Sequence, residues 1–133
     1  MNTQKKAVSN DLTNDAIIAV NLMLAERAVL IRPACTPVEV EPLNNSNFEL
    51  NQLYKLIDCR LIDVVQIPNP ETLQYDGKYI MIVDDEGLLA NRPVLNLLAT
   101  VLRVDTGEGI TREQVNALAI AGNAIICPSD MLK

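Results

Sequence analysis

The chain has 133 residues, of which 49% are hydrophobic and 21% charged, and its 17 acidic and 11 basic side chains give a net charge of −6. A chain of this length and composition folds as one domain and buries roughly two-thirds of its unfolded surface, which excludes a disordered or collagen-like chain. The negative charge argues against general binding to the phosphates of nucleic acid. With one Phe, three Tyr and no Trp, an aromatic platform for single strands is also poorly supplied.

Histidine is absent from the sequence. This removes the commonest general base, the Ser-His and Cys-His nucleophile pairs and the usual catalytic zinc ligands. The three cysteines, Cys35, Cys59 and Cys127, form no C-x-x-C pair, so neither a zinc knuckle nor a dithiol motif is expected. An odd number of cysteines without a signal peptide fits the reducing cytosol. We therefore expect a cytoplasmic protein without catalytic activity, metal or cofactor.

The N-terminal region combines a polar start with an apolar helix. Residues 1–12 are expected to fray, and Thr13 is positioned to cap a helix over about residues 14–26. The apolar run within it, residues 16–25, is too short to cross a bilayer. Because apolar side chains surround most of this helix, it must be covered on several sides. We expect a homodimer that pairs through this helix, with Asn21 fixing the register, or through the exposed edge of the sheet.

A hairpin and a helix are predicted next. Residues 28–31 are apolar throughout and residues 38–41 alternate between apolar and acidic, which predicts two strands joined by a longer loop. Ser46 and Glu49 have the spacing of a capping box. Apolar residues at helical spacing then predict a helix over about residues 47–57.

Two more strands and a second helix occupy the middle of the chain. Residues 60–67 and 79–83 have the composition of strands, and the second is apolar on both faces, which places it inside the sheet. Helical spacing of apolar residues predicts a helix over about residues 93–103, with Pro93 near its first turn.

The C-terminal part contains a short helix and a last strand. Thr111 and Gln114 have capping-box spacing, which predicts a helix that ends near residue 119. Residues 124–127 are apolar and predict the final strand. Helices and strands do not alternate strictly along the chain, so we predict an α+β fold. It has a small mixed or mostly antiparallel sheet of about five strands with three to four helices, in a single domain over residues 13–133.

Several segments of the chain resemble the domain of unknown function three-eight-four-six, a small family encoded by phages and bacteria. These segments are residues 28–33, 53–57, 62–65, 82–89 followed by Asn91, Pro93, Asn96, Ala99 and Thr100, and 122–126. The resemblance covers residues 28–127, and the N-terminal helix is additional. Similar proteins tend to have Gly-Gly where Asp58 and Cys59 stand, Glu where Asp63 stands and Asp where Asn123 stands. Because the family has no assigned function, the resemblance implies a protein of phage or mobile-element type and no particular activity.

The densest acidic cluster is formed by Asp84, Asp85 and Glu86. Two or three carboxylates with turn carbonyls can hold Ca²⁺ or Mg²⁺, although the spacing of an EF-hand is missing. We interpret the cluster either as a solvated turn at the end of a strand or as a contact for a weak cation or a basic partner.

A fourth carboxylate, that of Asp63, is predicted on the same strand face as Val65. A buried carboxylate is costly unless it is paired. Asp63 is therefore expected in an ion pair with an arginine, at an exposed edge strand, or as an acid in a pocket. The arginines considered are Arg32, Arg60 and Arg92.

Asn91 and Arg92 stand at the predicted start of a helix, directly before Pro93. Backbone N–H groups at a helix N-terminus with an arginine nearby can bind phosphate or carboxylate. The alternative is ordinary capping, with Arg92 paired to Asp84 or Asp85. No Gly-rich loop of a nucleotide-binding type occurs in the sequence.

These observations favour a small acidic binding or interaction protein without catalysis, which contacts a protein partner and forms a homodimer. The alternative is a protein that sequesters or senses a small anionic ligand in a pocket near Asp63, Asn91 and Arg92. A third hypothesis, a hydrolase that uses carboxylates and a divalent cation, rests on Asp84, Asp85 and Glu86 alone. No membrane contact and no binding to nucleic acid are expected.

Overall fold

The computed structural model describes residues 2–105 and 107–132, with side chains described from residue 12 onward. Its five-stranded sheet has the order β2-β1-β5-β4-β3, and every pair of neighbouring strands is antiparallel. The strands are β1 (Ala28–Ile31), β2 (Val38–Val40), β3 (Ile62–Gln66), β4 (Tyr79–Asp84) and β5 (Ala124–Pro128). The helices are α1 (Asn2–Leu24), α2 (Leu50–Ile57), α3 (Leu97–Val104) and α4 (Arg112–Ala117), with 3₁₀ turns η1 (Gly87–Leu89) and η2 (Ser129–Met131). The predicted α+β class is confirmed.

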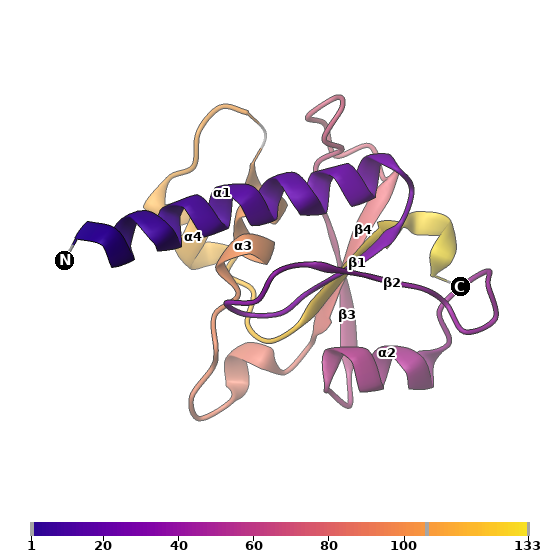
Figure 1. Cartoon of the computed structure of the whole chain (residues 1–133). Helices are drawn as coiled ribbons and strands as arrows, with labels where there is room; N and C mark the ends of the chain where they lie inside the picture. Colours follow the sequence, from indigo (N-terminus) through magenta and orange to yellow (C-terminus); the bar gives the residue numbers. More distant parts are fainter. Residues whose placement is uncertain (1, 106, 133) are drawn as a thin grey trace.

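Helices cover both faces of the sheet (Figure 1). The core on the face of α1 and α3 includes Ala19, Met23, Val29, Ile31, Met81, Val83, Leu98 and Ile126. The core on the face of α2 includes Leu30, Leu53, Ile57, Ile80, Ile82 and Ile125. Because successive strand residues point to opposite faces, β4 and β5 contribute to both cores and are buried along nearly their whole length. The interior position predicted for residues 79–83 is therefore confirmed.

Local sequence signals set several of the element boundaries. The Thr111 side chain accepts a hydrogen bond from the Gln114 N–H at 3.1 Å, and the Gln114 side chain accepts one from the Thr111 N–H at 2.9 Å. This is the predicted capping box, and it starts α4. The predicted hairpin of β1 and β2 is also present, with Ala28 opposite Val40.

The starts of α1 and α2 differ from the prediction. α1 begins at Asn2, so Thr13 lies within the helix instead of capping it. α2 begins at Leu50 with Glu49 as its N-cap, and no side chain caps it. The predicted Ser46–Glu49 capping box is wrong because the Asn44 side chain accepts from the Ser46 N–H at 2.9 Å and holds this segment in a turn. No helix within the described residues has the length and hydropathy needed to cross a membrane.

The start of α3 also differs, and here the reason is a buried contact. The helix begins at Leu97, not near Pro93, because the Asn96 side chain accepts a hydrogen bond from the Ala99 N–H at 3.1 Å and acts as the N-cap. Only 1% of Asn96 is exposed, and its Nδ2 donates to the carbonyls of Ile31 and Gly122, each at 2.9 Å. A contact to two distant backbone segments therefore decides where α3 starts.

Thr100, one turn further along α3, extends this buried polar network. Its hydroxyl donates to the Asn96 carbonyl at 2.8 Å and accepts from the Ile120 N–H at 2.9 Å. The Asn96 N–H in turn donates to the Ile120 carbonyl at 2.7 Å. Asn96 and Thr100, which we call the Asn96 network, thus attach the segment before β5 to α3 through Ile120 and Gly122.

Candidate functional site

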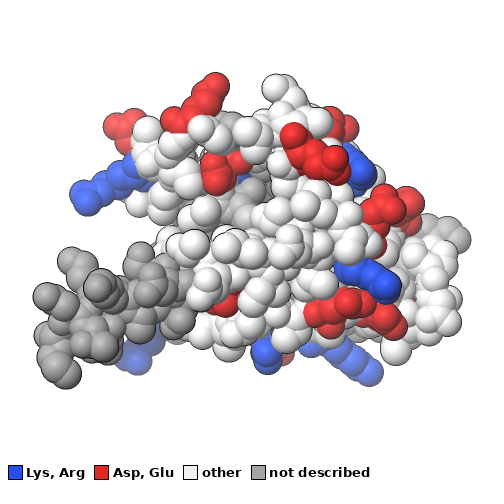
Figure 2. Space-filling model, turned by 45° about the horizontal axis from the view of Figure 1, so that its top comes forward, with Lys and Arg blue, Asp and Glu red and all other residues white. Residues whose placement is uncertain are grey.

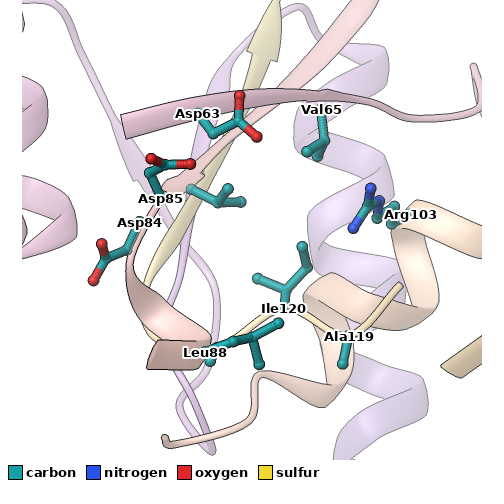
Figure 3. A pocket seen from close by; sticks show the side chains of 10 residues that line it. Asp63, Val65, Asp84, Asp85, Leu88, Arg103, Ala119 and Ile120 are labelled. Atoms are coloured by element: carbon teal, nitrogen blue, oxygen red, sulfur yellow. The ribbon is translucent and has the colours of Figure 1, made fainter. Parts of the chain in front are cut away.

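A cavity of about 150 Å³ lies between the edge strand β3, the turn that follows β4, and the segment that the Asn96 network fixes. Its lining comprises Asp63, Val65, Val83, Asp84, Asp85, Leu88, Arg103, Ala119, Ile120 and Ala121. Figure 3 shows the aspartates on one side of the cavity and the guanidinium of Arg103 entering from the opposite side. Acidic and basic groups separated along the sequence therefore face the same small space.

Asp63 lies on β3, the last strand of the sheet, and is exposed. The Leu61 carbonyl accepts from the Asp85 N–H at 3.0 Å. The alternation of an antiparallel ladder then directs the N–H and C=O groups of Ile62, Val64 and Gln66 toward the free edge. The Asp63 carboxylate accepts from the outward Val64 N–H at 2.9 Å. Of the three placements predicted for Asp63, the structure combines the exposed edge strand with the pocket.

The turn after β4 brings two further carboxylates to the cavity. The Asp84 carboxylate accepts from the Glu86 N–H at 2.9 Å, which closes the turn. Asp85 is exposed. Gly87 holds the turn against the opposite wall, because a Cβ on this residue would lie 2.6 Å from the Ala121 carbonyl oxygen. Asp84 and Asp85 therefore lie in the predicted turn at the end of a strand, and both line the cavity.

Glu86 leaves the cluster and does not line the cavity. It forms a two-pronged ion pair with Arg60, with Nε–Oε1 at 2.8 Å and Nη2–Oε2 at 3.0 Å. The hydrogen bonds from Arg60 lower the pKa of the Glu86 carboxyl and raise the pKa of the Arg60 guanidinium. Among the described residues, no group of three or more carboxylates and thiols is arranged to hold a metal ion. Asp84, Asp85 and Glu86 are thus adjacent in the sequence but lie in different surroundings in the fold.

Arg103 is the cation of the site and was not among the predicted site residues. It stands in the last turn of α3, where its Nη1 donates to the Leu118 carbonyl at 3.1 Å. The Tyr75 hydroxyl donates to the Arg103 carbonyl at 2.9 Å. No carboxylate of the described chain lies within 4.0 Å of this guanidinium. In the sequence, the only indication of its role was that Arg103 lies on the polar side of an amphipathic helix. A solvated arginine without a function occupies the same kind of position.

A second cavity of about 440 Å³ adjoins the first and shares Asp63, Val65 and Arg103 with it. Its other lining residues are Val64, Gln66, Tyr75 and Leu118. Together the two cavities form a groove along β3, which we call the β3 groove. It is wide on the side of Tyr75 and narrow on the side of Asp85.

Asn91 and Arg92 lie outside this groove. Both are exposed in the loop between η1 and α3 and line neither of its cavities. They were predicted at a helix start, but α3 begins at Leu97 because Asn96 is its cap. The structure therefore brings Asp63 together with Asp84, Asp85 and Arg103, and separates it from Asn91 and Arg92.

Comparison with known protein families gives a match over most of the chain. Residues 26–131 match the family described as Domain of unknown function (DUF3846). This confirms the resemblance inferred for residues 28–127, and α1 precedes the matched segment. No curated protein and no solved structure is matched by the chain.

Proposed function

The chain belongs to the DUF3846 family, and we propose that it is a non-catalytic binding protein whose β3 groove receives a lysine or arginine side chain of a protein partner. The observation that carries this proposal is the narrow cavity, where Asp63, Asp84 and Asp85 line one side. A charge-assisted hydrogen bond to a carboxylate is roughly twice as strong as a neutral one, so a cationic group gains most from this wall.

The size of the narrow cavity supports a side chain as its occupant. A cavity of about 150 Å³ is large enough for a benzene-sized group, which corresponds to the end of a lysine or arginine side chain. The adjoining 440 Å³ cavity leaves room for the neighbouring residues of a peptide. Two of the three carboxylates, Asp63 and Asp84, are oriented by backbone N–H groups. Their geometry supports recognition, and no histidine is available for proton transfer.

The charge of the groove favours a cation over the small anion considered from the sequence, because three aspartates and one arginine line the narrow cavity. Arg103 nevertheless supports a second candidate, a small zwitterion such as a free basic amino acid. In that case Arg103 binds the carboxylate of the ligand and the aspartates bind its side chain. The reducing cytosol remains the proposed compartment, since Cys35, Cys59 and Cys127 are all free.

The test is a titration of the ¹⁵N-labelled protein with Nα-acetyl-lysine amide and Nα-acetyl-arginine amide, followed by NMR. We expect shifts in the amides of residues 63, 85 and 119–121 and none with the uncharged Nα-acetyl-norleucine amide. Asp85→Asn should weaken binding roughly three- to tenfold. Glu49→Gln is the matched control, because Glu49 is an exposed carboxylate at the start of α2 on the other face of the sheet.

Two results would contradict the proposal: no shift in the groove at millimolar ligand, or equal affinity in Asp85→Asn and the unsubstituted protein. Free lysine separates the two candidate functions. If it binds more tightly than its capped form and Arg103→Gln removes only that difference, the zwitterion is the ligand.

A further inference from the structure

Arg103 is the only cation among the residues that line the β3 groove, and it is half-buried. Its Nη1 donates to the Leu118 carbonyl, and no other atom of the described residues accepts a hydrogen bond from the guanidinium. We propose that Arg103 binds a carboxylate of the partner, from an acidic residue next to the basic residue that the aspartates receive. This inference rests on the proposed function, because it assigns the neighbour of the bound lysine or arginine.

The position of Arg103 in the fold does not by itself require a guanidinium in the groove. A cation is favoured at the C-terminus of a helix, and Arg103 stands in the last turn of α3. An arginine directed to solvent satisfies that preference equally well. Figure 3 instead shows the guanidinium directed into the cavity. The hydrogen bonds of Arg103 with Leu118 and with the Tyr75 hydroxyl hold it there, so that a ligand can contact it.

Arg103 and the aspartates line the same narrow cavity without forming an ion pair. The salt bridges within 4.0 Å in the described part of the chain belong to Arg27, Arg60 and Lys78. The groove therefore keeps its two signs of charge apart. A ligand that carries both charges can pair with both walls, whereas a purely basic ligand leaves the guanidinium without a charged partner.

The order of charges along the groove places the acid next to the base. Asp84 and Asp85 line only the narrow cavity, whereas Arg103 lines both cavities. A basic side chain in the narrow cavity therefore has Arg103 beside it, toward the wider one. Successive side chains of an extended segment point to opposite sides, and the aspartates and Arg103 lie on opposite sides of the cavity (Figure 3). An acidic residue directly adjacent to the basic one is thus directed toward Arg103.

The remaining surface offers an acidic residue little attraction. The chain has a net charge of −6. On the face shown in Figure 2, the Lys and Arg side chains are scattered and form no continuous basic patch. A partner's carboxylate is therefore not drawn to the protein by its overall field. It is bound only through direct contact with a positioned guanidinium, which makes Arg103 a determinant of specificity.

The experiment titrates the ¹⁵N-labelled protein with capped dipeptides and follows the groove amides by NMR. The ligands are the acetylated amides of Lys-Glu and Glu-Lys, and their glutamine counterparts Lys-Gln and Gln-Lys. We expect the acidic dipeptide, in at least one of the two orders, to bind roughly three- to tenfold more tightly than its glutamine counterpart. Because all four ligands are capped, no terminal carboxylate contributes to this preference.

Arg103→Gln should abolish the preference, and Arg103→Lys should recover part of it, because the charge remains and the two-pronged geometry is lost. Arg92→Gln is the matched control. It removes the same charge from an exposed position outside the groove and should keep the full preference. A circular dichroism spectrum like that of the unsubstituted protein will confirm that each variant is folded.

Two results would overturn the inference. The first is equal affinity of the unsubstituted protein for the acidic and glutamine dipeptides in both orders. The second is an Arg103→Gln variant that binds all dipeptides more weakly by the same factor, which would mean that Arg103 only supports the wall. If capped lysine binds while the acid adds nothing, the inference fails and the proposed function stands. If no ligand shifts the groove amides, both fail.

Discussion

Two neighbouring polar regions of this fold use their side chains in opposite ways. In the Asn96 network, Asn96 and Thr100 are buried and each of their polar side-chain atoms has a partner. In the β3 groove, Asp85 and Arg103 face a cavity, and neither takes part in an ion pair within the described residues. Satisfied buried groups stabilise one arrangement of the chain, whereas charged groups at a cavity that lack an ion-pair partner are available to a ligand. The Asn96 network holds one wall of the β3 groove in place.

The largest loss of stability is expected from Asn96→Ala, which disrupts the Asn96 network. The substitution leaves the carbonyls of Ile31 and Gly122 and the N–H of Ala99 without their buried partner. Since each such group costs about 1–3 kcal/mol, we expect the free energy of unfolding to fall by at least about 3 kcal/mol. Urea denaturation measures it. Asn91→Ala, in an exposed loop, should change it by less than about 0.5 kcal/mol, and equal losses in both variants would show that the network is not the stabilising feature.

A smaller loss of stability is expected where the turn after β4 contacts the opposite wall of the β3 groove. Gly87→Ala places a Cβ 2.6 Å from the Ala121 carbonyl oxygen, so the turn or the wall must move. We expect a loss of about 1–3 kcal/mol in urea denaturation, as for an overpacked site. Leu89→Ala serves as the control because Leu89 is 80% exposed in the same turn. If Gly87→Ala is as stable as Leu89→Ala, the close approach is easily relieved and the groove wall is not rigid.

The smallest effect is expected at the Arg60–Glu86 ion pair, neither residue of which lines the β3 groove. Arg60 lowers the pKa of Glu86, so the pair stabilises the fold above the pKa of an unfolded glutamate, about 4.3. That contribution disappears as the pH falls from this value through the lowered pKa of the folded state. Arg60→Gln should therefore have a slightly lower urea midpoint at pH 7 and the same midpoint as the unsubstituted protein in strong acid. A deficit that persists in strong acid would mean that Arg60 acts by packing and not by charge.

The sequence predicts the elements whose signals are local. The alternation and apolar runs of β1, β2, β4 and β5 need only neighbouring residues, as does the capping box of Thr111 and Gln114. The start of α3 was misplaced toward Pro93 because its cap, Asn96, is selected by carbonyls of Ile31 and Gly122 that are far away in the sequence.

The candidate site was predictable only in its acidic half. Asp63, Asp84 and Asp85 stand at strand ends that pair as neighbours, so a strand assignment brings them together. The position of Arg103 opposite the aspartates depends on how the chain returns from α3 to β5. The buried contact of Thr100 with Ile120 sets that path. Glu86 looks equivalent to its neighbours in the sequence, yet the turn directs it to Arg60.

The carboxylate of Asp63 has a consequence for how far the sheet can grow. At the free edge of β3, the central outward N–H belongs to Val64, and Asp63 already occupies it. An incoming strand would have to displace a charged acceptor before it could register with the ladder, which makes edge-to-edge association costly. If the β3 groove receives a partner's side chain as proposed, the partner's main chain stays outside the hydrogen-bonding pattern of the sheet. The acidic residue that lines the β3 groove thus also opposes fibre-like stacking of the sheet.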